Sequence, residues 1–152
     1  MAGRSGRGDK KGEVVIETRY PEHYTLLLAS KQDFIGFAEK ELVMRREVFY
    51  PPTFRLCRVL FTCLDLGFLK EKLAQNSALL IVLKKEFPEG EFLLLPFIEA
   101  PIPKIKNKYR YHFIIKSAKA VYIQRFLDRF IEEFDCPQKI GMVVDVDPLS
   151  LL

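Results

Sequence analysis

The order in which two kinds of hydrophobic periodicity follow one another most constrains the fold of this chain. Runs rich in β-branched and aromatic residues predict strands, and runs with apolar residues three and four apart predict helices. After Tyr50-Pro51-Pro52, where proline stops the preceding helical pattern, the expected elements are a strand at 54–63, a helix at 64–86, strands at 91–98 and 109–116, a helix at 118–134 and a strand at 140–146. This β-α-β-β-α-β order is the signature of an α+β, split βαβ (ferredoxin-like) sandwich.

Shorter elements are expected around this core. The β-branched run at 13–18, EVVIET, predicts a strand, and residues 22–48 predict two helical pieces with Asp33 as the N-cap of the second. The segment APIPKIKNK, residues 100–108, is rich in proline and lysine and is expected to be a loop.

The positive charge of the chain is confined to one window. The formal net charge is only +4, but residues 100–127 contain seven basic side chains and no Asp or Glu, which leaves 17 basic against 20 acidic residues elsewhere. The seven are Lys104, Lys106, Lys108, Arg110, Lys116, Lys119 and Arg125. A basic window of this kind indicates an anionic partner more strongly than the overall charge does.

Alternation along the strand expected at 109–116 divides this charge from the apolar side chains. The two sets are Lys108, Arg110, His112, Ile114 and Lys116 on one face and Tyr109, Tyr111, Phe113 and Ile115 on the other. Helices should cover the apolar set, so the basic set is predicted to lie on the open face, extended by Lys104 and Lys106, where it contacts phosphates. Tyr109 or Tyr111, if exposed at an edge, would stack on a base. The alternative is a solvated face whose lysines serve solubility.

Other chemistry finds little support in the sequence. The cysteines are Cys57, Cys63 and Cys136, without CxxC spacing, so buried reduced thiols of a cytosolic protein are expected instead of a zinc site. No apolar run reaches the roughly 18 residues of a membrane span. No apolar core follows the first basic residues, so the N-terminus is not expected to be a secretory signal. His23 and His112 lack a catalytic partner at motif spacing, and Asp145 with Asp147 provides too few ligands for a cation.

The N-terminal string GRSGRG, residues 3–8, is by itself typical of a disordered tail. It nevertheless resembles the last conserved motif of superfamily 2 helicases, Q-x-x-G-R-x-G-R, without its Gln. Further segments resemble, in order, the bacterial primosomal protein N′ family of replication-restart helicases, and the likeness is weakest between about residues 63 and 95. These segments are GDKKGEVVIETRYPEHY, KQDFIGFAEKEL, YPPTF, PIPKIKNKYRYHFIIKS and VDVDPLSLL.

The resemblance implies a division of the chain and roles for two arginines. Residues 1–20 would be the end of the second motor lobe, 21–52 a helical connector, and 53–152 a C-terminal DNA-binding domain with a ribosomal-protein-like fold. Arg4 and Arg7 match the motif arginines that contact the ATP γ-phosphate, so they are the catalytic residues implied, acting only in the intact motor.

The same resemblance implies the activity and the partners. Family members are ATP-dependent 3′→5′ DNA helicases that use ATP and Mg²⁺, carry a zinc region, restart stalled forks and assemble the primosome. Forked or single-stranded DNA, single-strand-binding protein and primosome proteins are the implied partners, with a monomer expected in the bacterial cytoplasm at the nucleoid and no membrane contact.

This chain departs from the family in lacking G-x-x-x-x-G-K-[ST], the phosphate loop, and the cysteines of the zinc region. We therefore expect a C-terminal fragment that shows no ATPase activity alone. Two alternatives remain open at this stage. One is a free-standing RNA-binding or ribosome-associated module with Tyr109 and Tyr111 as stacking platforms. The other is a protein-interaction domain whose basic face receives an acidic tail.

Overall fold

The computed structural model describes residues 14–151. The chain forms two compact units, Met1–Glu41 and Leu42–Leu152, and each is described by itself. The division predicted at residues 20 and 52 stays a prediction. None of the helices within 14–151 is long and apolar enough to cross a membrane.

The described part of the first unit is helical. Helix α1 (Tyr24–Ser30) is followed by α2 (Phe34–Glu47), which begins in this unit and ends in the second. The Oδ1 atom of Asp33 accepts a hydrogen bond from the N–H of Gly36 at 2.9 Å, which confirms the predicted N-cap of α2. The hydroxyl of Tyr24 donates to Oε2 of Glu41 at 2.5 Å and ties the two helices together.

The strand predicted at 13–18 does not form in the described part of that segment, residues 14–18. Val14, Val15 and Ile16 are all more than half exposed there. A strand requires a neighbour to take up its backbone hydrogen bonds, and none of the strands at 14–151 pairs with this segment. The β-branched residues favour a strand, but no strand within 14–151 is there to pair with this segment.

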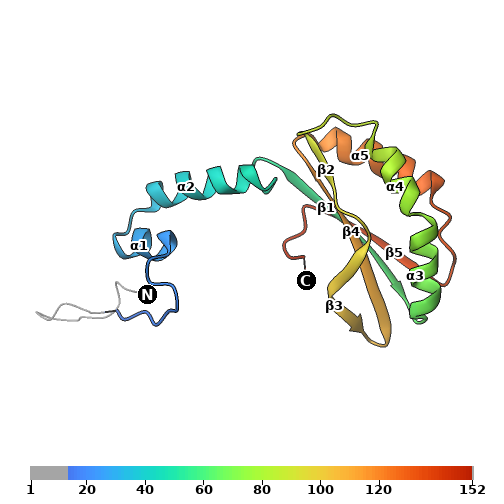
Figure 1. The fold of residues 1–152 in the computed structure, drawn as a ribbon, viewed down its shortest axis with the longest axis horizontal. Coiled ribbons are helices and arrows are strands. Elements are labelled where there is room, and N and C mark those ends of the chain that lie inside the picture. The colour runs from blue at the N-terminus through green and yellow to red at the C-terminus, as the bar shows by residue number, and fades with distance from the viewer. Residues whose placement is uncertain (1–13, 152) are drawn as a thin grey trace, which may run out of the picture. The chain divides into compact units, whose positions relative to one another are not determined.

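The second unit is built on a five-stranded sheet covered by helices. The strands are β1 (Arg55–Cys63), β2 (Phe92–Leu94), β3 (Ile98–Ile105), β4 (Lys108–Ser117) and β5 (Gly141–Val146), and the helices are α3 (Leu66–Gln75), α4 (Ser77–Lys84) and α5 (Ala120–Glu133). All pairings are antiparallel, in the order β2-β4-β1-β5, with β3 also paired to β4. The three helices lie on one side of the sheet (Figure 1). The α+β class predicted from the periodicities is confirmed.

The segment expected to be a loop at 100–108 is mostly strand β3, so that prediction was wrong. The strand expected at 91–98 is reduced to β2, and Pro96 separates it from β3. Both strands pair with the same strand, β4, at its two ends. The prolines at 101 and 103 are tolerated because β3 is an edge strand whose register shifts between Glu99 and Lys104.

The single helix expected at 64–86 is divided in two at Asn76. The N–H of Phe68 donates to Oδ1 of Asp65 at 3.0 Å and starts α3. The side chain of Asn76 donates to the carbonyl of Lys72 at 2.9 Å, so it competes with the helical backbone pattern where α3 ends. The leucine spacing continued across this break, which is why periodicity alone did not reveal it.

Aromatic side chains fill the space between sheet and helices. Phe61 on β1 and Phe113 on β4 are fully buried, as are Phe126 and Phe130 on α5. The ring of Phe61 lies with its centroid 5.3 Å from Phe134 and 6.0 Å from Phe113, a separation typical of attractive aromatic pairs. This core fixes β4 against the helices and so determines which side chains of β4 face away.

Replacing Phe61 with alanine tests this core. The Phe61→Ala variant leaves a cavity among several rings, and its free energy of unfolding should fall by about 3–5 kcal/mol. Urea denaturation followed by circular dichroism measures the change. Val143→Ala is the control, because Val143 is 55 % exposed and its truncation should cost far less. Equal losses in the two variants would contradict the assignment of Phe61 to the core.

Candidate nucleic-acid interface

The basic window folds into a hairpin of β3 and β4. Ile105 is paired with Lys108, and the two residues between them, Lys106 and Asn107, have φ angles of 48° and 64°. Positive φ at both central residues is the geometry of a type I′ turn, whose twist matches that of the flanking strands. Lysine and asparagine at a turn of this type leave the end of the hairpin polar.

Lysine side chains surround the end of this hairpin. Lys104, Lys106 and Lys108 are all exposed. The Nζ atom of Lys104 lies 4.6 Å from the ring centroid of Tyr109 and 3.5 Å from its hydroxyl. Their exposure agrees with the prediction. Lys104, however, pairs with Tyr109 and therefore projects from the side of the sheet that carries the tyrosines, whereas the sequence predicted the open face. We refer to Lys104, Lys106 and Lys108 as the hairpin lysines.

Arg110 lies deeper than expected, with 7 % of its surface exposed. Its Nη1 donates to the carbonyl of Ile102 at 3.1 Å, across the hairpin. A carbonyl oxygen orients the guanidinium but carries no net charge, so the positive charge of Arg110 is held in place and not neutralised.

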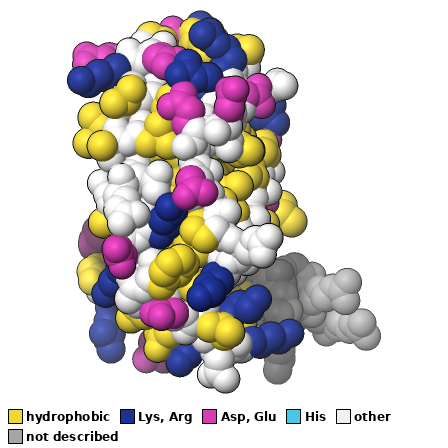
Figure 2. All heavy atoms as spheres, turned by 90° about the vertical axis from the view of Figure 1, so that its right-hand side faces the viewer, with side chains coloured by type: hydrophobic (Ala, Val, Ile, Leu, Met, Phe, Trp, Pro, Cys, Tyr) yellow, Lys and Arg dark blue, Asp and Glu magenta, His cyan; other side chains and the backbone are white. Residues whose placement is uncertain are grey.

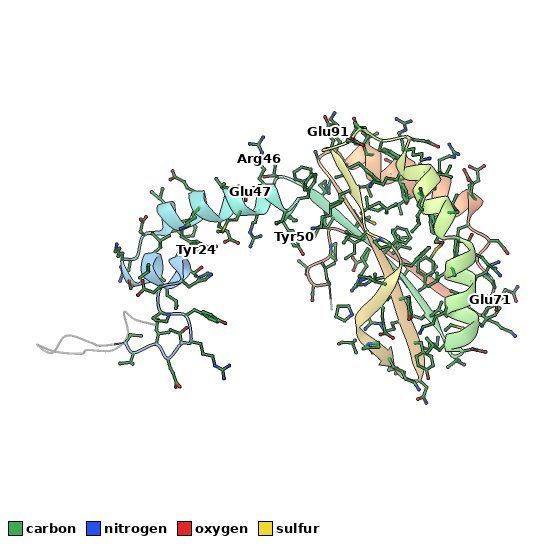
Figure 3. All side chains as sticks on the ribbon, viewed as in Figure 1. Tyr24, Arg46, Glu47, Tyr50, Glu71 and Glu91 are labelled. Atoms are coloured by element: carbon green, nitrogen blue, oxygen red, sulfur yellow. The ribbon has the colours of Figure 1, made fainter. Side chains whose placement is uncertain are left out.

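Lys116 is also buried, at 8 % exposure, where the sequence predicted an open face. Its Nζ donates to the carbonyl of Val48 at 2.9 Å and lies 4.1 Å from the ring centroid of Tyr50. Figure 3 shows Tyr50 in the segment between α2 and β1. This segment covers the far end of β4, and burial lowers the pKa of Lys116 from its ordinary value. Lys116 therefore holds this segment to the sheet.

The two tyrosines are not free stacking platforms. Tyr109 and Tyr111 are half-buried and pack against the hydrophobic core. Tyr111 also lines an apolar cleft of about 400 Å³ between α3, α4 and the chain at Pro96 and Phe97. Both tyrosines lie on the side of β4 that the alternation predicted. Because they pack against the core there, little of either ring surface is left exposed for stacking on a base.

The hairpin cations lie close together without carboxylate partners among the described residues. Within residues 14–151, neither the hairpin lysines nor Arg110 forms an ion pair. Some cations elsewhere are held by carboxylates, as in Arg58 Nη2 to Asp145 Oδ2 at 3.1 Å and Lys119 Nζ to Glu91 Oε2 at 2.7 Å. Figure 2 shows acidic, basic and apolar side chains intermixed on the helix-bearing side. What distinguishes the hairpin is the clustering of four such cations within residues 104–110, where the sequence has no Asp or Glu.

His112 lies beside these cations on β4 and is 2 % exposed. Burial lowers its pKa from the ordinary value, and the charges of Arg58 and Arg110 lower it further. Among the described residues nothing bonds its Nδ1 atom. The imidazole is thus buried beside two guanidinium groups that disfavour its protonated form.

Several predicted features concern metals, thiols and the N-terminus. Within the described range no group of three or more His, Cys, Asp or Glu side chains could hold a metal ion. The cysteines are unbridged, and burial raises the pKa of Cys57 to about 12, with Asp145 and Asp147 adding to the rise. Arg4 and Arg7 lie outside the described residues.

Sequence reasoning missed side chains that neighbour the predicted set. Thr62 on β1 lies opposite Arg110, and Arg58 lies opposite Ile114 on the same face of the sheet. Alternation along β1 could have placed both on one face, but only the pairing register shows which residues of β4 they meet. Ile105, counted within a loop, is instead the last residue of β3.

The fold and the hairpin together define a small α+β domain with a basic edge hairpin. A family model described as "Primosomal protein N C-terminal domain" matches residues 46–149, and the chain belongs to that family.

Curated relatives match almost the whole chain. Proteins named replication restart protein PriA are 31% identical over 150 residues in Chlamydia pneumoniae, covering 99% of this chain and 20% of the relative, and 31% identical over 151 residues in Synechocystis, covering 99% and 17%. The Bacillus subtilis protein of that name is 28% identical over 155 residues, covering 100% and 19%. The chain spans about a fifth of the length of these relatives.

The environment of His112 predicts a pH dependence of stability. The unfolded chain takes up a proton near pH 6.5, the ordinary histidine pKa, whereas the folded chain resists it. As the pH falls through and below that value the unfolded state binds more protons, so the free energy of unfolding decreases. Urea midpoints at about pH 7.5 and about pH 5.5 should therefore differ less in His112→Leu than in the unsubstituted chain. His23→Gln is the control and should keep the full difference. An undiminished difference in His112→Leu would refute this assignment.

Proposed function

We propose that this chain acts in the restart of stalled replication forks, as the C-terminal part of an ATP-dependent 3′→5′ DNA helicase. Its own contribution is auxiliary DNA binding. Family membership over residues 46–149 supports the restart role, and the hairpin cations support the contact with DNA. Forked or single-stranded DNA is the substrate we propose, with the bacterial cytoplasm and nucleoid as its place of action.

The observation that carries the DNA-binding proposal is the uncompensated charge of the hairpin. The hairpin lysines are exposed and have no ion-pair partner among the described residues. Lysines without a carboxylate partner can neutralise the phosphates of DNA. The cations that had condensed on those phosphates are then released, and this release favours binding. Such contacts give affinity with little sequence preference. Lys116 and the half-buried tyrosines contribute less in this proposal, because they are already engaged within the domain.

We assign the second unit to the split βαβ arrangement. The strand order supports this, since α3 and α4 join β1 to β2 while α5 joins β4 to β5. Strand β3 then continues the edge begun by β2. This arrangement leaves one side of the sheet without helices, and the basic residues of β4 lie on that side.

The remaining parts of the proposal come from the family alone. Arg4 and Arg7 would contact the γ-phosphate of ATP, with Mg²⁺, in an intact motor, and residues 1–20 would belong to its second lobe. Single-strand-binding protein and primosome proteins are the proposed partners. Glutamine substitutions at Arg4 and Arg7 within a complete motor would test these roles.

DNA binding by the full chain should depend steeply on salt. Three phosphate contacts predict that affinity for a fluorescent forked duplex falls about 40-fold between roughly 50 and 200 mM salt. The triple variant Lys104→Gln, Lys106→Gln, Lys108→Gln should bind more weakly at low salt and should lose most of this dependence. Fluorescence anisotropy of the purified chain measures both quantities.

The matched control removes the same charge from the helices, as Lys70→Gln, Lys84→Gln, Lys85→Gln. These lysines are exposed on or beside α3 and α4, and their loss should leave the salt dependence nearly unchanged. Equal weakening by both variants would show that only net charge matters and would reject the hairpin as the site. Tighter binding to structured RNA than to forked DNA would instead favour an RNA-binding module.

A further inference from the structure

A small cleft lies beside the turn of the β3–β4 hairpin. It has a volume of about 270 Å³ and is lined by Thr62, Ile105, Lys106, Lys108 and Arg110. Pockets for drug-sized ligands have volumes of about 300–1,000 Å³, so this cleft suits a smaller group. Three of its five lining residues are cations and none is acidic.

The sheet register brings these side chains together. Thr62 of β1 lies directly opposite Arg110 of β4, and Ile105 of β3 lies opposite Lys108 of β4. Residues 108 and 110 are two apart on one strand, so both side chains project from the same face. The cleft is therefore formed by three adjacent strands and the turn, all within a single rigid sheet.

Arg110 is the most firmly held of the cations. Its Nη1 bonds the Ile102 carbonyl, and the residue is 7 % exposed, yet it still lines the cleft. The other guanidinium N–H groups remain to donate, and a guanidinium fixed in advance loses little conformational entropy when it binds an oxyanion.

Gly141 on β5 preserves room for the hydroxyl of Thr62. The two residues are paired across β5 and β1, and a Cβ atom at position 141 would lie only 2.7 Å from Oγ1 of Thr62. A larger residue would push the hydroxyl from its position. The glycine thus leaves space for the hydroxyl of a neutral residue that lines the cleft together with three cations.

We propose that this cleft holds one phosphate group of a nucleic-acid backbone, bound by Arg110 and the Thr62 hydroxyl from below and by Lys106 and Lys108 from the rim. The inference rests on the proposed DNA-binding function and makes it more specific, since it turns a diffuse basic hairpin into a site for a single phosphodiester. Ile105, 43 % exposed at the rim, offers an apolar contact to the adjoining sugar. The two oxygens of a peptide carboxylate lie in one plane with their carbon, whereas the two non-bridging and two ester oxygens of a phosphodiester are arranged tetrahedrally, which matches donors arriving from both floor and rim.

Two uncharged changes test the cleft without altering the field of the hairpin. Thr62→Val removes one donor at constant shape, and Gly141→Ala displaces that donor. Each should weaken binding of a single-stranded oligonucleotide to the full chain about fivefold. Arg110→Gln, which keeps an amide donor for the Ile102 carbonyl, should weaken it tenfold or more, about the value of a charge-assisted hydrogen bond. Arg125→Gln on α5 removes the same charge elsewhere and should have little effect. Thermal melts identify any variant that fails to fold, and Thr62→Val then carries the test.

A second arm uses inorganic phosphate, so that free phosphate and backbone phosphate are told apart. In ¹H–¹⁵N spectra phosphate should shift the amides of Thr62, Ile105 and Gly141 at millimolar concentration, and the oligonucleotide should shift the same amides at much lower concentration. Full oligonucleotide affinity in Thr62→Val, Gly141→Ala and Arg110→Gln, with loss only in the lysine variants, would overturn the cleft and leave the DNA-binding proposal intact. Amide shifts with phosphate but no binding of DNA would reject the DNA-binding proposal and, with it, a backbone ligand. Stronger shifts from a glutamate-rich peptide than from the oligonucleotide would overturn the choice of phosphate.

Discussion

Strand β4 is hydrogen-bonded along both of its edges, and the rest of the second unit depends on that pairing. β1 lies along one edge over its whole length, and β2 and β3 share the other. Neighbours on both sides fix the register, so Phe113 and Ile115 face the helices while Arg110, His112 and Lys116 face the other way. A slip of one residue would exchange the two faces. The aromatic core therefore also fixes the positions of the cations, because both sets of side chains belong to the same strand in one register.

Features that depend only on neighbouring residues in the sequence were predicted correctly. The alternation of side chains along β4, the α+β class and the cap at Asp33 could all be predicted from the sequence. The β3 strand was missed because Pro101 and Pro103 are loop signals, and only the edge position explains why they are tolerated. The burial of Arg110 and Lys116 was missed because their acceptors, the carbonyls of Ile102 and Val48, come from segments whose approach no periodicity encodes.

The cations of the sheet differ in whether their hydrogen-bond partner is charged. Arg58 is paired with a carboxylate of β5, whereas Arg110 and Lys116 bond neutral carbonyls. A carboxylate cancels a charge, but a carbonyl satisfies a donor and leaves the charge in force. Lys116 is covered by the segment at Tyr50, so its field reaches solvent less than that of Arg110. Four cations without an ion-pair partner among the described residues are thus gathered near the hairpin turn, within residues 104–110, although the whole chain carries a formal charge of only +4.

The same prolines that concealed β3 also determine how a ligand can meet it. An exposed edge strand invites another strand through its free N–H and C=O groups. Pro101 and Pro103 lack N–H groups, and the register shift between Glu99 and Lys104 interrupts the line of acceptors. Addition of a partner strand along β3 is thereby disfavoured, while the side chains beyond it stay open. A ligand that approaches this edge must be recognised through side-chain charge and hydroxyl groups, and a phosphate backbone satisfies that requirement where an extended peptide does not.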